Sequence, residues 1–307
     1  MHDWNEYSAI VREKVPLAPF TTWRIGGSAR WYARPSADSL PGLLALANEG
    51  GIPVCFLGRG SNVLIGDDGI DGLVVHSKQS LEGIHRISDD LVEADAGVPL
   101  PRLSRFVANL GCAGFEFLIG IPGTVGGGIV INAGLRSPFR REISDVLDAV
   151  DVLESDGTIC TLAARELGLR YRGSTLLERG LFVLRARFRL EDFRSGSEVI
   201  RKRTAHHLLE RRQNQPLNRR TAGSTFKQVQ AGPATGWYIE KAGLKGHRVG
   251  GAMVSHKHAN WIETDSDARA DDVRGLMEVM VGTVQEKFGV KLEREVRFLP
   301  EDVGFHA

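Results

Sequence analysis

The chain has 307 residues, of which 42% are hydrophobic, 25% are charged and 36 are glycine. This length is sufficient for two or three domains with hydrophobic cores of their own. The formal net charge of +1 excludes the strong overall field that would favour nucleic acid or a membrane surface.

No apolar run approaches the roughly 18 residues of a membrane-spanning helix, and the amino terminus has no secretory signal pattern. We therefore expect a cytoplasmic protein without membrane insertion. Cys55, Cys112 and Cys160 are odd in number, far apart and surrounded by apolar residues. This pattern indicates small core side chains in a reducing compartment and not a disulfide or metal framework.

The first elements predict an α/β unit. Thr21–Ile25 reads as a strand that ends in a glycine pair, and a helix from about Pro41 stops at Gly50-Gly51. The apolar strand 52–57 then runs directly into the glycine loop 58–62. Loops at the carboxyl ends of strands are where open sheets bind ligands.

The middle of the chain predicts α+β structure. Short strand patterns lie at 73–75, 84–87 and 91–94, and a helical pattern covers 103–110. Asp156-Gly157 predicts a hairpin within 150–161, and residues 181–190 alternate like a strand. Residues 201–220 hold seven Arg or Lys against one acid, either a solvated helix face or a positive rim for an anionic substrate.

The last part predicts a helix and a strand. One apolar stripe from Val273 to Phe288 predicts an amphipathic helix that Gly289 ends. Residues 292–298 alternate as a strand, with Glu295 on one face.

A second glycine-dense stretch runs from Gly114 to Gly128 and continues to Asn132-Ala133-Gly134. The Pro122-Gly123 step predicts a tight turn, after which the amides of Thr124 and its neighbours converge on one point. That arrangement is either an anion nest suited to a diphosphate or a close-packed turn between buried elements.

The two glycine loops together favour one long ligand. Gly58-Arg59-Gly60 lacks the third glycine of a dinucleotide fingerprint, because Val63 stands there, and no Gly-Lys-Ser/Thr triplet of a P-loop is present. Two nests suit a ligand held along its diphosphate, such as FAD. Ser61 and Asn62 add side-chain donors near the first nest.

Three polar residues carry candidate chemistry, each with an ordinary alternative. Ser224 follows a glycine and reads as a turn or helix cap, or as a hydroxyl that passes a proton to a carbanion. Arg172 suits a carboxylate or a surface salt bridge, and Glu295 suits catalysis or an outward strand face. His206-His207 and His256-x-His258 lack the further ligands of a zinc site, so no metal is expected.

Five stretches together resemble the UDP-N-acetylenolpyruvoylglucosamine reductase family, in the branch that lacks a tyrosine-bearing loop over the substrate. They occur in the family's order and span nearly the whole chain. They are Leu57–Ile65, Gly114–Gly127 with Asn132-Ala133-Gly134, Tyr171-Arg172-Gly173-Ser174, Ala222–Lys227 with Glu240–His247 and Ser255–Ala259, and Leu292–Arg297.

The resemblance implies a fold and a division into domains. The fold is α+β, with a two-part FAD-binding unit of the vanillyl-alcohol-oxidase (PCMH) type and an α/β substrate domain. The implied parts are a first FAD subdomain at 1–78, to which 296–307 return, a second at 79–205, and the substrate domain at 206–295.

The resemblance also implies a monomeric enzyme that reduces UDP-N-acetylglucosamine enolpyruvate with NADPH. Ser224 resembles the proton donor, and Arg172 and Glu295 resemble its two catalytic partners. Arg211, Arg212, Lys227 and Arg297 are the implied substrate contacts. The implied cofactor-binding residues are Gly58, Arg59, Gly60, Ser61, Asn62, Gly120, Ile121, Pro122, Gly123, Thr124, Gly126, Gly127, Asn132, Ala133 and Gly134.

The chain departs from the family pattern at two places. Gln228-Val229 stand where Asn-Pro is common, and Leu135–Pro138 replace an aromatic residue and a glycine. Two alternatives remain open: a flavin oxidase or dehydrogenase of the same fold with another substrate, and a nucleotide-sugar binding protein without turnover.

Overall fold

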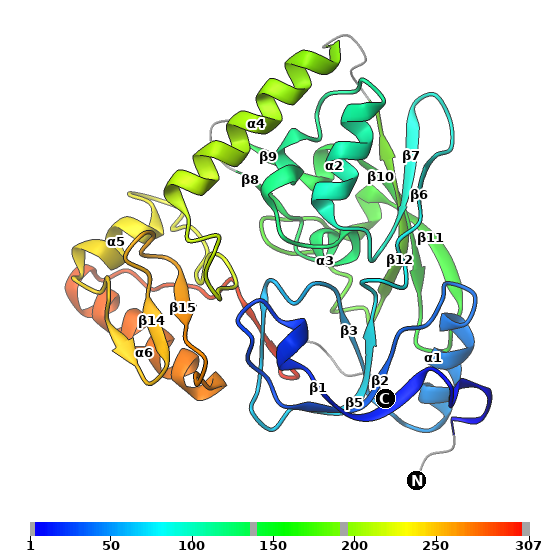
Figure 1. Cartoon of the computed structure of the whole chain (residues 1–307), viewed down its shortest axis with the longest axis horizontal. Helices are drawn as coiled ribbons and strands as arrows, with labels where there is room; N and C mark the ends of the chain where they lie inside the picture. The colour runs from blue at the N-terminus through cyan, green and yellow to red at the C-terminus, as the bar shows by residue number, and fades with distance from the viewer. Residues whose placement is uncertain (1–3, 136–139, 191–195, 303–307) are drawn as a thin grey trace.

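The computed structural model describes residues 4–135, 140–190 and 196–302. The chain forms three parts, two of which lie against each other while the third stands to one side (Figure 1). The long helix α4 (Gly196–Asn214) reaches from the second part to the third. The departure from the family pattern at 136–138 lies outside the described residues.

The first part is a four-stranded sheet in the order β1-β2-β5-β3. β2, β3 and β5 are buried along most of their length, whereas β1 at the edge of the sheet is mostly exposed. β1 and β2 are antiparallel, whereas β5 is parallel to β2 and β3. The elements are η1 (Asn5–Tyr7), β1 (Val11–Pro16), η2 (Ala18–Phe20), β2 (Ser28–Ala33), α1 (Leu40–Glu49), β3 (Val54–Leu57), β4 (Val63–Ile65) and β5 (Ile70–His76).

The predicted strand at Thr21–Ile25 is wrong. These residues form a loop, and Trp23 and Ile25 pack into the hydrophobic core of the third part instead of a sheet. The indole Nε1 of Trp23 donates to the carbonyl of Ile262 at 3.0 Å. An alternating apolar pattern alone could not reveal that the side chains serve a distant core.

The second part is an antiparallel sheet in the order β11-β10-β12-β7-β6, which confirms the predicted hairpin and strands. α2, η3 and α3 lie beside it (Figure 1). The elements are β6 (Ile84–Arg86), β7 (Leu91–Asp95), α2 (Leu100–Asn109), η3 (Glu116–Gly120), α3 (Val125–Val130), β8 (Gly134–Leu135), β9 (Arg141–Glu142), η4 (Ile143–Asp145), β10 (Leu147–Leu153), β11 (Ile159–Ala163), η5 (Ala164–Leu167) and β12 (Phe182–Arg189).

The third part packs a small sheet, β13-β14-β15, against the amphipathic helix α6. Val273, Leu276 and Met280 are fully buried there, and Gly289 ends α6 with φ +66°, as predicted. Helix α4 runs without a break through residue 205, so the division into domains at that position stays a prediction. The elements are α5 (Thr235–Lys241), β13 (Arg248–Val249), β14 (Ala252–Val254), β15 (Ile262–Thr264) and α6 (Ala270–Phe288).

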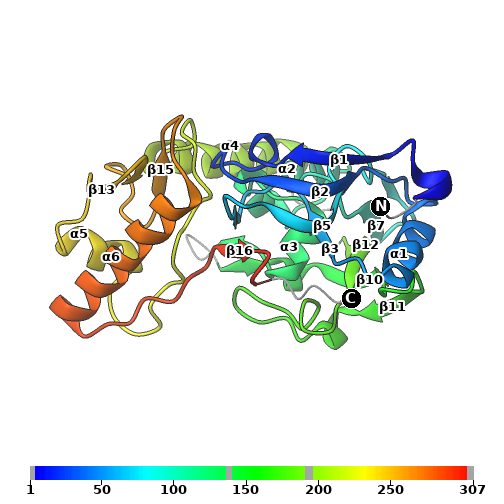
Figure 2. The ribbon, with the colours of Figure 1, turned by 90° about the horizontal axis from the view of Figure 1, so that it is seen from below.

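The carboxyl-terminal segment crosses from the third part back to the first (Figure 2). Its strand β16 (Arg297–Leu299) pairs in parallel with β4. The predicted strand at 292–298 is therefore right only for its end, since residues 292–296 form isolated backbone bonds with 225–227. Within the described ranges, no helix is long and apolar enough to cross a membrane.

Candidate active site

The first glycine loop, residues 58–62, follows directly from β3. Among the described residues, none of its five backbone amides donates to a protein acceptor. Gly60 has φ +61°, and a methyl group on it would lie 2.3 Å from the carbonyl oxygen of Phe20. The loop therefore needs glycine for its shape, and it leaves consecutive N–H groups for a ligand.

The second glycine loop, residues 120–128, differs from its prediction. Pro122-Gly123 lie in an extended segment between η3 and α3 and not in a tight turn, because Leu100 donates to the Gly123 carbonyl at 3.0 Å and holds it extended. The Gly126 amide donates to Ala96 at 2.8 Å, so this glycine serves packing. In the described structure, the amides of Gly123, Thr124 and Gly127 donate to no protein group.

The two loops face each other, and we call them together the cofactor cradle. A methyl group on Gly58 would lie 2.4 Å from Thr124 Oγ1, and one on Gly123 would lie 3.9 Å from Ser61 Oγ. Two sets of unpaired amides thus line one narrow space, as a bound diphosphate requires. The residues present therefore fit FAD.

A buried cation lies against the same cradle. The Arg211 side chain packs on Gly120, where a methyl group would lie 2.3 Å from Arg211 Cδ. Its Nε is buried and has no hydrogen-bond partner in the described part of the chain, and burial lowers the pKa of its guanidinium to about 10. A desolvated cation that has no acid partner among the described residues favours an anionic ligand.

Asn132 braces the cradle from outside. The side chain is 2% exposed; its Nδ2 donates to Glu142 at 3.2 Å, and its Oδ1 accepts from the Ser144 amide at 3.0 Å. The amides of Asn132 and Ala133 donate to Ile129 and Gly128. These groups are therefore used within the protein, whereas the carbonyl of Gly134 accepts a hydrogen bond from Arg172.

Arg172 and Glu295 form a close ion pair although they are 123 positions apart. Arg172 Nε donates to Glu295 Oε1 at 2.6 Å, and the two side chains are only 17% and 11% exposed. A second guanidinium nitrogen donates to the Gly134 carbonyl at 3.2 Å. Arg172 has φ +56°, a conformation that costs a non-glycine residue about 1–2 kcal/mol. These contacts hold the strained residue in place.

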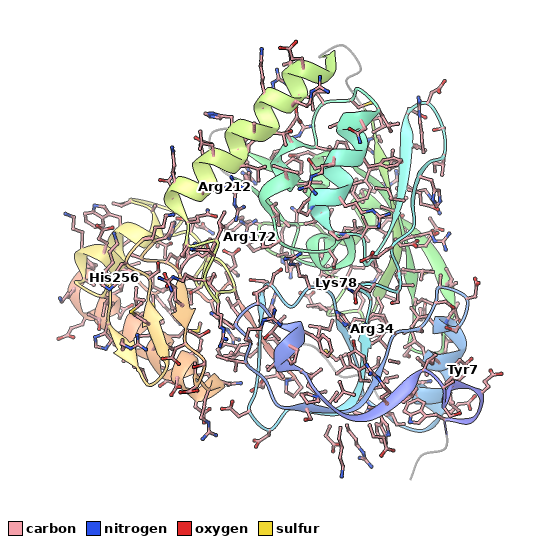
Figure 3. All side chains as sticks on the ribbon, viewed as in Figure 1. Tyr7, Arg34, Lys78, Arg172, Arg212 and His256 are labelled. Atoms are coloured by element: carbon pink, nitrogen blue, oxygen red, sulfur yellow. The ribbon has the colours of Figure 1, made fainter. Side chains whose placement is uncertain are left out.

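Ser224 lies next to this pair. The Glu295 amide donates to the carbonyl of Thr225 at 2.9 Å, so the backbones that carry Ser224 and Glu295 are adjacent. Within the described residues, the Ser224 hydroxyl makes no hydrogen bond to the protein, which leaves it able to bond a ligand. We call Arg172, Ser224 and Glu295 the catalytic corner; Figure 3 shows Arg172 where the three parts meet.

The other predicted substrate contacts lie in varied settings. Lys227 Nζ donates to Glu293 Oε2 at 3.4 Å, and Arg212 is exposed near the end of α4 (Figure 3). The Arg297 amide donates to Asn62 at 3.0 Å, which places β16 directly beside the first glycine loop. Ile121, Pro122 and exposed Arg59 lie in the cradle loops.

Sequence reasoning missed Asn260, which contacts the segment that follows Ser224. In the sequence, Asn260 was distinguished only as a polar residue between Ala259 and Trp261, which is a weak indication of a functional role. Among the described residues, no group of three or more His, Cys, Asp or Glu is placed so that it could hold a metal ion.

Comparison with known proteins agrees with this geometry. Residues 33–163, which contain both glycine loops, match the family described as FAD binding domain. The chain therefore contains an FAD-binding domain, within the expected α+β architecture.

The match extends to one particular family. Residues 215–299 match the C-terminal domain of UDP-N-acetylenolpyruvoylglucosamine reductase. The reductase of that name from Synechococcus sp. (strain JA-3-3Ab) is 41% identical over 95% of this chain and 92% of its own. The one from Caldicellulosiruptor saccharolyticus is 39% identical over 93% and 91%.

A solved structure supports the same assignment. The crystal structure of the reductase from Thermus caldophilus superposes with a TM-score of 0.78 at 35% identity, covering 94% of this chain and all of that one. The chain belongs to the UDP-N-acetylenolpyruvoylglucosamine reductase family, which confirms the resemblance found in the sequence.

Proposed function

We propose that this protein reduces UDP-N-acetylglucosamine enolpyruvate to UDP-N-acetylmuramate with NADPH, as a cytoplasmic monomer in peptidoglycan precursor synthesis. The observation that carries the proposal is the catalytic corner beside the cofactor cradle. A half-buried guanidinium, a carboxylate and a hydroxyl without a hydrogen bond among the described residues come from three distant segments, and Asn62 of the cradle donates to the Glu295 carbonyl at 3.3 Å.

FAD, when bound, supplies a carrier that takes hydride from NADPH and gives it to the enol-ether methylene of the substrate. The remaining work falls to the side chains. Reduction of an enolpyruvyl group builds negative charge that spreads into its carboxylate. Arg172 is suited to bind this carboxylate, because a guanidinium offers a planar pair of donors and a permanent charge. A preorganised charge of this kind is usually a large term in catalysis.

Glu295 and Ser224 have complementary roles in the proposal. Glu295 holds the Arg172 guanidinium through the 2.6 Å contact, which fixes the direction of its other donors. Ser224 donates the proton that completes the reduction at the carbon next to the carboxylate. The unbonded state of its hydroxyl supports this role.

The diphosphate of the substrate requires positive charge near the corner. Arg211, Arg212, Lys227 and Arg297 are the proposed contacts. The side chain of the half-buried Arg211 packs on Gly120 of the cradle, so it is suited to an anion of either the cofactor or the substrate.

Flavin absorbance tests the whole proposal. Purified protein should be yellow, should bleach when NADPH is added without oxygen, and should recover its colour when the enolpyruvyl substrate follows. Bleaching without recovery would instead indicate a flavoenzyme with another substrate. Colourless protein that takes up no added FAD would indicate a nucleotide-sugar binding protein and would contradict the proposal.

A further inference from the structure

Asn260 is fully buried and clamps the backbone just after Ser224. Its Oδ1 accepts from the Phe226 amide at 3.1 Å, and its Nδ2 donates to the Phe226 carbonyl at 2.8 Å. Its own carbonyl accepts from the Thr225 amide at 2.8 Å. The side chain is 0% exposed. Asn260 thus makes three hydrogen bonds to two consecutive residues.

Asn260 holds residues 224–226 on one side, and backbone hydrogen bonds hold them on the other. On the other side, regular backbone bonds join Lys227 to Glu293 at 2.8 Å and Glu295 to Thr225 at 2.9 Å. Facing Asn260, the backbone pairing within the described residues is an isolated bridge between Ser224 and Trp261, to which the Thr225–Asn260 bond belongs, and β15 begins one residue later. A side-chain amide offers one acceptor and one donor side by side, as a neighbouring strand would.

The side chain of Thr225 does not brace the segment in its place. Thr225 is fully buried, and its Oγ1 has no hydrogen-bond partner in the described part of the chain. The position of residues 224–226 therefore depends on the Asn260 amide on one side and on the segment that carries Glu295 on the other.

We propose that Asn260 is a positioning residue for proton donation, which holds the Ser224 hydroxyl in register with Glu295. Asn260 has no hydrogen bond to Ser224 in the described part of the chain and acts through its bonds to Thr225 and Phe226. This inference rests on the proposed role of Ser224 as the proton donor. Its consequence is confined to the half-reaction that reduces the substrate, because flavin reduction by NADPH needs no proton from Ser224.

The first test is Asn260→Leu in the FAD-loaded enzyme, followed by stopped-flow flavin absorbance. Leucine has a similar volume but leaves both Phe226 groups without partners. We expect flavin reduction by NADPH within about twofold of the parent and flavin reoxidation by the enolpyruvyl substrate slowed about 10–100-fold. Equal slowing of both half-reactions, or of neither, would overturn the proposal.

A matched control separates this effect from general loss of a buried hydrogen bond. Thr264 lies in the same part, is 9% exposed, and its Oγ1 donates to the Trp23 carbonyl at 2.9 Å without touching 224–226. Thr264→Val should leave both half-reactions within about twofold even where it lowers the melting temperature. Slowed reoxidation in Thr264→Val would overturn the assignment to Asn260.

Pairing the change with Ser224→Ala tests whether Asn260 acts through Ser224. If it does, Asn260→Leu in the Ser224→Ala background slows the residual reoxidation by less than about twofold, since residues of one unit are not additive. A further tenfold loss in that background would overturn the proposal. Parent-like reoxidation in Ser224→Ala alone would instead refute the role of Ser224, so the two failures are distinguishable.

Asn260→Asp gives a second route should the leucine variant not fold. A neutral carboxylic acid has the shape of the amide and keeps one acceptor and one donor, whereas its ionised form places an oxygen against the Phe226 carbonyl. Burial raises the pKa of such an acid. The reoxidation rate relative to the parent should therefore rise at least about fivefold from pH 8 to pH 5.5. Because His258 is present in both proteins, the ratio removes its titration; a flat ratio would contradict the proposal.

Discussion

The cofactor cradle and the catalytic corner differ in which atoms do the binding. The cradle is made of backbone amides from two short loops, each continuous in sequence, and side chains matter there mainly by being absent. The corner is made of side chains from three segments that only the fold brings together. A backbone site is therefore broken by adding atoms, and a side-chain site by removing them.

The largest expected effect concerns the corner. Ser224→Ala should slow flavin reoxidation by the substrate about 10²–10⁴-fold, the usual contribution of a positioned proton donor, while flavin reduction by NADPH stays within about twofold. Stopped-flow absorbance of the two half-reactions measures both. Unchanged reoxidation would remove Ser224 from the mechanism and weaken the contrast with the cradle.

The next effect concerns the cradle and is caused by adding atoms instead of removing them. Gly60→Ala adds one methyl group that meets backbone 2.3 Å away and forces φ +61° on an alanine. We expect the free energy of unfolding to fall by about 3 kcal/mol and flavin to be lost on purification. Gly282→Ala in α6 is the control, since it lies outside the cradle and its methyl group would meet no atom within 4 Å. Equal loss in both variants would argue against a shape-specific loop.

A buried histidine beside the cradle should make the free energy of unfolding of the protein depend on pH. His76 pairs with Leu57, just before the first loop, and is 3% exposed. Burial, followed by the charges of Arg34 and Lys78, lowers its pKa from 6.5 to about 4, with the Gly58 backbone opposing the shift.

The sign of that dependence follows from proton binding. Between pH 6.5 and 4 the unfolded chain holds the proton on His76 and the folded chain does not. The free energy of unfolding should therefore be complete above pH 6.5 and lose about 3 kcal/mol by pH 4. Urea unfolding of His76→Gln and the parent at several pH values measures the difference; parallel curves would contradict this origin.

The smallest expected effect compares Glu295 with Ser224 within the catalytic corner. Glu295→Gln keeps an acceptor for Arg172 Nε but removes the charge, so we expect reoxidation to slow about 10–100-fold and less than in Ser224→Ala. The same stopped-flow measurement applies. A larger loss than in Ser224→Ala would indicate that Glu295 does more than hold Arg172.

The sequence predicted the cradle better than the corner for a physical reason. A loop that binds a ligand through its backbone needs several glycines close together in the sequence. The loops 58–62 and 120–128 could therefore be found from the sequence alone. Even there, the extended Pro122-Gly123 segment and the packing role of Gly126 depended on bonds from Leu100 and to Ala96, which no local pattern shows. Tertiary contacts decided those details.

The corner shows the opposite limit. Arg172, Ser224 and Glu295 were each ordinary by local pattern, and only the resemblance to a family joined them. The loop around Trp23 and the clamp of Asn260 escaped notice, because their partners lie in other parts of the chain. Residues 21–25 predicted a strand, but Trp23 and Ile25 instead pack into the hydrophobic core of the third part.

The pairing of β16 with β4 has a consequence for biosynthesis. The carbonyl of Asn62 in the first glycine loop accepts from the Arg297 amide, and its side chain donates to the Glu295 carbonyl, 233 positions further along the chain. A nascent chain folds from its amino terminus as it emerges. We therefore expect the flavin to be captured only after residues 295–297 have emerged from the ribosome and paired with the first glycine loop.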